Sequence, residues 1–104
     1  MVGEIHIANI YFTDASTSKI RPVLLLKTNS FNDILYLPLT TNTIVKGIRL
    51  TNKQLKEGYL PKVSMVVYEK PGVIATSLLV KKIGTLNDNT HEAIIDKLIE
   101  FIQK

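Results

Sequence analysis

The sequence predicts a mostly β domain, in which a small, strongly curved antiparallel sheet forms a partly open barrel and one α-helix follows at the C-terminus. Roughly six or seven short runs of β-forming residues are separated by turn residues. The connections between these runs are too short for the crossovers that parallel strands need. The hydrophobic period becomes helical only near the end of the chain. With 104 residues, the chain is expected to form a single domain over residues 1–104.

The strands are predicted from alternation and from β-branched or leucine-rich runs between turns. Glu4 to Phe12 alternates such that both faces carry apolar side chains, which indicates a strand covered on both sides. Thr13 to Lys19 has the small polar side chains of a loop. The other predicted strands are Arg21 to Lys27, Asp33 to Leu39, Gly47 to Thr51, Val63 to Tyr68, Val73 to Ala75 and Leu79 to Ile83.

Two segments have a helical pattern. Asn52 to Glu57 is predicted to make one or two helical turns that end at Gly58. Near the C-terminus, Asn89 and Glu92 have the spacing of a capping box at a helix start. The apolar stripe of the predicted terminal helix consists of Ile94, Ile95, Leu98, Ile99 and Ile102.

Composition excludes several classes of protein. The chain has no cysteine, so disulfide frameworks, thiolate nucleophiles and cysteine-based metal sites are excluded. Its apolar runs are too short to cross a bilayer, and the N-terminus lacks the pattern of a secretory signal. We therefore expect a cytoplasmic protein with no membrane association.

The charge is unevenly distributed along the chain. Residues 1–87 carry eleven Lys and Arg against five Asp and Glu, a net charge of +6, whereas residues 88–104 carry a net charge of −2. A basic body suits a polyanionic partner, either nucleic acid or an acidic protein. A lysine-rich surface that only maintains solubility explains the same numbers.

Few side chains have the pattern of a catalytic or metal site. Glu92, Asp96 and Glu100 share one face of the predicted helix, where a solvated acidic surface is the simpler interpretation than a cation site. No other group of carboxylates or histidines has ligand spacing, so no metal is expected. The two histidines, His6 and His91, could act as an acid and a base, but packing and exposure explain both.

The segment that ends in Arg21-Pro22 favours binding of a phosphate group. Proline pushes the preceding Arg21 into an extended conformation, which fixes its direction at the entrance of a strand. A guanidinium held in this way offers a planar fork for phosphate oxygens, with Lys19 nearby. Thr40-Thr41-Asn42, at the end of the next strand, supplies neutral donors. If the two strand ends are adjacent, Arg21 and Thr40 can hold one phosphate, although an ordinary strand-edge charge is the alternative.

The order of several short motifs resembles a known family. The motifs are Gly3-Glu4-Ile5, Phe12-Thr13-Asp14, Ser18 to Leu26 with its Arg-Pro-Val-Leu core, Leu37-Pro38-Leu39-Thr40, Gly58 to Ser64 and Leu79 to Leu86. Together they cover nearly the whole chain in the order found in MazF/PemK-type toxins (mRNA interferases) of bacterial type II toxin–antitoxin systems.

The resemblance implies an SH3-like barrel of the MazF/CcdB/PemK type and a homodimer. It also implies a metal-independent endoribonuclease, without a cofactor, that cleaves single-stranded RNA at short sequences. In this family the RNA 2′-hydroxyl attacks the adjacent phosphate; Arg21 matches the catalytic arginine and Thr40 the catalytic threonine. The expected RNA-binding residues are Ser16, Ser18 and Lys19, in a lip over the RNA, together with Thr41 and Asn42. A cognate antitoxin with an acidic, extended segment is the implied protein partner.

Two alternatives use the same barrel without catalysis. One is a protein-binding poison similar to the CcdB group, which acts on DNA gyrase through its terminal helix. The apolar Phe101 and Ile102 near the end of this chain fit that hypothesis, as they fit core or dimer packing. The other alternative is a barrel that binds RNA without cleaving it.

Overall fold

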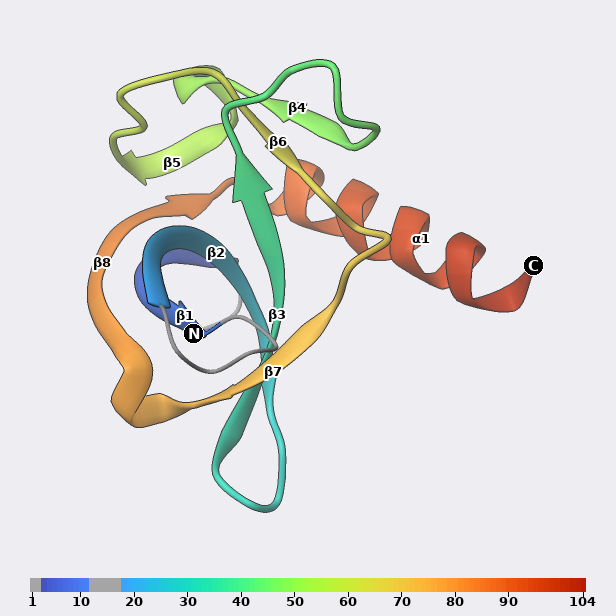
Figure 1. The fold of residues 1–104 in the computed structure, drawn as a ribbon. Helices are drawn as coiled ribbons and strands as arrows, with labels where there is room; N and C mark the ends of the chain where they lie inside the picture. The colour runs from blue at the N-terminus through green and yellow to red at the C-terminus, as the bar shows by residue number, and fades with distance from the viewer. Residues whose placement is uncertain (1–2, 12–17) are drawn as a thin grey trace.

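The computed structural model describes residues 3–11 and 18–104, which form a curled antiparallel sheet and one long helix (Figure 1). The strands are β1 (Glu4–Tyr11), β2 (Ser18–Thr28), β3 (Asp33–Thr40), β4 (Ile48–Leu50), β5 (Leu55–Gly58), β6 (Ser64–Val66), β7 (Gly72–Ala75) and β8 (Leu79–Leu86). Two short 3₁₀ turns cover Asn52–Gln54 and Thr76–Leu78, and the helix α1 covers Asp88–Gln103. The predicted mostly β fold with a C-terminal helix is confirmed.

The sheet has the order β4-β6-β3-β2-β1-β8-β5, and every pairing is antiparallel. Strand β3 is shared: Asp33 to Tyr36 pair with β7, whereas Leu39 and Thr40 pair with β6. Strand β8 curves around β1 and β2 in Figure 1. Within the described residues the end strands β4 and β5 do not pair with each other, so the barrel is partly open, as predicted.

Successive residues of β2 point to opposite faces of the sheet and enter two separate apolar clusters. Leu24 and Leu26 belong to the larger cluster, which α1 completes with Ile94 and Leu98. Val23 and Leu25 belong to the smaller cluster, together with Ala8, Ile34 and Ile74. This explains why the sequence of the first strands is apolar on both faces. Arg21 is two residues from Val23 and four from Leu25, so its side chain lies on the same face of β2 as theirs, the face of the smaller cluster.

The segment predicted as one or two helical turns, Asn52 to Glu57, is helical in its first half and extended in its second. Only Asn52–Gln54 is helical, because a capping box between Thr51 and Gln54 closes a single turn. Leu55 is then extended and pairs with Leu86 of β8, so β8 runs further than predicted. Gly58 does not end a helix: it ends β5 with a φ of +88°, directly against the backbone of Ile83 and Gly84.

The predicted helix is present, but its cap and its apolar stripe differ from the prediction. Asn87, rather than Asn89, is the N-cap; its side-chain oxygen accepts a hydrogen bond from the Thr90 N–H at 2.8 Å. Ile94 and Leu98 are buried, whereas Ile99 and Ile102 are exposed although they continue the stripe. The C-terminal end of the helix projects away from the sheet in Figure 1. No helix in the described ranges is long and apolar enough to cross a membrane.

Candidate functional site

Arg21 and Thr40 line the same pocket, which opens where β2 and β3 diverge. The ladder between these strands pairs Val23 with Pro38, and the same register would place Arg21 opposite Thr40. The ladder ends at Val23 and Pro38, however; beyond it Arg21 still pairs with Ala8 of β1 and Thr40 with Met65 of β6, on the outer edges of the two strands. The diverging strands leave a pocket of about 410 Å³ between them.

The pocket combines apolar walls with a small set of polar groups. Its lining residues are Ile10, Arg21, Tyr36, Pro38, Leu39, Thr40, Val45, Val67 and Lys70. The polar groups are two cations, Arg21 and Lys70, and two hydroxyls, Thr40 and Tyr36. None of these lining residues is acidic. The pocket is therefore electropositive and suits an anion that carries an apolar or aromatic part.

Arg21 presents an exposed guanidinium with no ion-pair partner in the part of the chain that the structure describes. Its backbone is fixed twice, by the pairing with Ala8 and by the restriction that Pro22 imposes. Little conformational freedom of the backbone is lost when such a side chain binds an anion, and its fork can contact two phosphate oxygens at once.

The hydroxyl of Thr40 is oriented by the loop that follows it. The Asn42 backbone N–H donates to Thr40 Oγ1 at 3.1 Å, and the Ile44 N–H donates to Asn42 Oδ1 at 3.1 Å. Because the hydroxyl oxygen accepts from the backbone, its own hydrogen is left to donate to a ligand. Thr41 and Asn42 are exposed beside the pocket and do not line it.

The remaining residues predicted to bind RNA have a different setting from the one expected. Ser18 and Lys19 lie in β2 rather than in a loop, where they pair with Tyr11 and Ile10 of β1. The pairing of Lys19 with Ile10 places it next to a pocket-lining residue. Ser16 and the side chain of Ser18 lie outside the described part of the chain, as does Asp14.

Sequence reasoning missed two of the four polar pocket residues, Tyr36 and Lys70. Lys70 carries the same signal as Arg21, since a proline follows each of them. Tyr36 shares its strand face with Thr40, but only the β3–β7 pairing places it opposite Gly72. A β-carbon at Gly72 would lie 2.6 Å from the Tyr36 ring, so this glycine makes room for the ring. Burial raises the pKa of Tyr36, which keeps its hydroxyl protonated and neutral.

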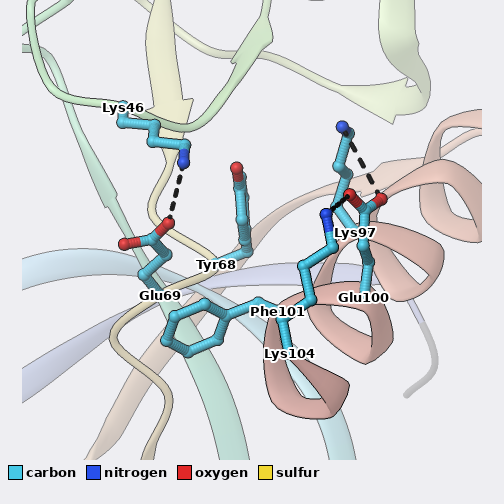
Figure 2. Close-up of a pocket in the computed structure, with 7 residues that line it drawn as sticks. All are labelled: Lys46, Tyr68, Glu69, Lys97, Glu100, Phe101 and Lys104. Atoms are coloured by element: carbon cyan, nitrogen blue, oxygen red, sulfur yellow. Dashed lines mark hydrogen bonds and ion pairs between the residues drawn. The ribbon is translucent and has the colours of Figure 1, made fainter.

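A second hollow, of about 340 Å³, lies between the C-terminal end of α1 and the loop before β4 (Figure 2). Its cations are already paired with carboxylates. Lys46 contacts Glu69 at 3.1 Å, while Lys104 and Lys97 contact Glu100 at 3.1 and 3.9 Å. These pairs neutralise much of the local charge, so this hollow is the weaker anion site of the two.

The histidines and the helix carboxylates form no catalytic group. His6 Nε2 lies 2.8 Å from Glu4 Oε1, a hydrogen bond that lowers the pKa of Glu4, while His91 packs near Gly3. Neither histidine lines a pocket described above. Within residues 3–11 and 18–104, no three His, Asp or Glu side chains are placed to hold a metal ion.

Comparison with known proteins gives two findings. Residues 1–102 match the family described as PemK-like, MazF-like toxin of type II toxin–antitoxin system. The solved structure of Mycobacterium tuberculosis toxin MazF-mt6 is 25% identical, with a TM-score of 0.71 over 96% of each chain. No curated protein sequence matches. The structural match confirms that the curled, partly open sheet with its terminal helix is the MazF toxin fold.

Proposed function

The chain belongs to the PemK-like, MazF-like toxin family of type II toxin–antitoxin systems, and from this premise we propose that it is a metal-independent endoribonuclease. Its substrate is single-stranded mRNA, which it cleaves at short sequences. The observation that carries the proposal is the pocket that Arg21 and Thr40 both line, with no carboxylate among the lining residues.

The reaction uses the nucleophile of the substrate. The ribose 2′-oxygen forms a bond to the adjacent phosphorus, and the bond from phosphorus to the 5′-oxygen breaks. The products are a 2′,3′-cyclic phosphate and a 5′-hydroxyl; the proton lost by the 2′-hydroxyl is balanced by one gained at the 5′-oxygen. The protein therefore needs no serine, cysteine or metal-bound nucleophile. It must align the attacking oxygen with the leaving oxygen and stabilise the charge on the non-bridging oxygens.

Arg21 and Thr40 suit these two tasks. Arg21 can donate two parallel hydrogen bonds to the non-bridging oxygens, whose negative charge grows in the transition state. Thr40 donates its hydroxyl hydrogen to the same phosphate, from an orientation that the Asn42 N–H fixes. Removing one preorganised donor of this kind typically costs a factor of about 10²–10³ in rate.

The proposal is tested by cleavage of a long unstructured RNA in the presence of EDTA. Arg21→Ala and Thr40→Val should each lower the rate at least about 10²-fold, while Thr40→Ser should retain most of it because the hydroxyl remains. Arg49→Ala and Thr43→Val are matched controls, since both side chains are exposed and lie outside the pocket. Normal cleavage by both site variants, with folding unchanged, would refute the assignment.

The proposed partners follow from the family and the charge. A toxin of a type II system implies an antitoxin, and an acidic, extended antitoxin segment would complement the two cations of the pocket and exclude RNA. We also propose a homodimer that acts on mRNA in the cytoplasm. Light scattering of the purified protein tests the dimer, and protection of RNA by added antitoxin tests the shared binding site.

The exposed end of α1 favours one alternative, a protein-binding poison. Phe101 and Ile102 are both exposed, and Phe101 borders the hollow in Figure 2. Deletion of residues 102–104 distinguishes the two functions. If the deletion abolishes toxicity while RNA cleavage persists, the poison is favoured. If toxicity and RNA cleavage are retained or lost together in every variant, the nuclease is favoured.

A further inference from the structure

We propose that Lys70 is a second phosphate-binding residue, which holds a different phosphate of the same RNA strand from the one bound by Arg21 and Thr40. This inference rests on the proposed function, because it assumes that the pocket binds RNA. It adds a residue from a separate part of the fold, the turn between β6 and β7. The result is a binding site that spans more than one nucleotide.

The pocket is large enough for this arrangement. Its volume of about 410 Å³ lies in the range of pockets that enclose whole small-molecule ligands, and it exceeds what a single phosphate group needs. Apolar side chains from four segments and the Tyr36 ring line the space that the two cations share. A sugar or base with a phosphate on either side therefore matches the lining better than an isolated anion.

The backbone holds Lys70 at the pocket. The Lys70 N–H donates to the Val67 carbonyl at 3.2 Å, which closes a turn, and the Val67 N–H donates to the Pro38 carbonyl of β3 at 2.9 Å. Pro71 restricts the conformation of Lys70, as Pro22 restricts that of Arg21. Gly72 then starts β7 against Tyr36. Both pocket cations thus extend from restricted backbone positions.

The acidic neighbour of Lys70 does not neutralise it. Glu69 directs its carboxylate to Lys46, 3.1 Å away, in the hollow at the C-terminal end of α1 (Figure 2). Successive residues therefore line different hollows: Glu69 lines the one at α1 and Lys70 the one at Arg21. Among the described residues Lys70 has no carboxylate within ion-pair distance, so its charge remains available to a phosphate.

The test measures how salt affects binding to an RNA that cannot be cleaved. The probe is a short 2′-O-methyl-ribonucleotide oligomer of mixed sequence, and its affinity is measured between about 50 and 200 mM NaCl. Loss of one phosphate contact reduces the slope of log K against log [salt] by about 0.7 for a single strand. Lys70→Ala should show this reduction, and Lys70→Arg should restore the slope of the wild type.

Lys53→Ala is the matched control, because Lys53 is an exposed lysine outside the pocket; its slope should equal that of the wild type. In the cleavage assay, Lys70→Ala should raise KM more than it lowers kcat, whereas Arg21→Ala should mainly lower kcat. A slope for Lys70→Ala equal to that of the wild type would overturn the inference. RNA binding with the expected slopes but no cleavage by the wild type would instead refute the proposed function and leave the role of Lys70 intact.

Discussion

The contact between Gly72 and Tyr36 predicts that Gly72→Ala destabilises the protein when Tyr36 is present and does not when Tyr36 is replaced by alanine. Gly72 has an ordinary φ, so alanine fits the backbone; only the β-carbon, 2.6 Å from the Tyr36 ring, is unfavourable. Forcing an extra methyl group against a packed side chain costs about 1–3 kcal/mol. Replacing glycine at a compatible position gains about 0.4–1 kcal/mol through the unfolded state. We therefore expect Gly72→Ala to destabilise the protein by up to about 2.6 kcal/mol.

Tyr36→Ala removes the ring that the new β-carbon meets. In that background Gly72→Ala should be neutral or stabilising by up to about 1 kcal/mol. Urea unfolding of the wild type, the two single variants and the double variant gives the coupling energy between the residues. An equal destabilisation by Gly72→Ala in both backgrounds would refute the argument. Such a result would mean that the glycine matters for its backbone and not for the space it leaves to the ring.

Three further outcomes follow from the core, the helix cap and the partly buried His91. Ile94→Ala should destabilise the protein by about 2–5 kcal/mol, because Ile94 is fully buried, whereas Ile99→Ala at the exposed end of the stripe should cost less than about 1 kcal/mol in urea unfolding. Asn87→Ala should lower the free energy of unfolding by about 1 kcal/mol and Asn89→Ala by a few tenths at most; equal effects would contradict the assigned cap. Burial lowers the pKa of His91, so the unfolded chain binds its proton first and the protein loses stability as the pH falls below about 6.5. His91→Gln should flatten thermal stability between pH 7.5 and 5 relative to the wild type, and identical pH profiles would contradict this cause.

The sequence predicted those parts of the fold that depend on local pattern. Alternation in Glu4 to Phe12, of which Phe12 lies outside the described residues, and the apolar run after Pro22 identify β1 and β2, and the change to a helical period identifies α1. Arg21 is also predicted from local sequence, as a candidate phosphate-binding residue, because Pro22 restricts its backbone conformation. That Arg21 and Thr40 share a pocket followed only from the register of β2 and β3 and the divergence of the strands.

The features that sequence reasoning missed depend on contacts between distant segments. Leu55 is a strand residue because β8 offers it a partner, which no local propensity shows. The cap is Asn87 because β8 continues to Leu86 and sets where the helix can begin. Lys70 joins the site because the turn between β6 and β7 is held against β3, by the Val67–Pro38 hydrogen bond and by the pairing of β7 with β3. Gly72 of β7 leaves the space for the Tyr36 ring.

The chemical ends of the cleaved RNA test the central claim most directly, namely that the substrate supplies the nucleophile while Arg21 and Thr40 stabilise the phosphate. The account predicts 2′,3′-cyclic phosphate and 5′-hydroxyl ends, and no cleavage when the single ribose before the cut carries a 2′-deoxy substitution. Ends with a 5′-phosphate, or undiminished cleavage of the deoxy-substituted strand, would contradict it.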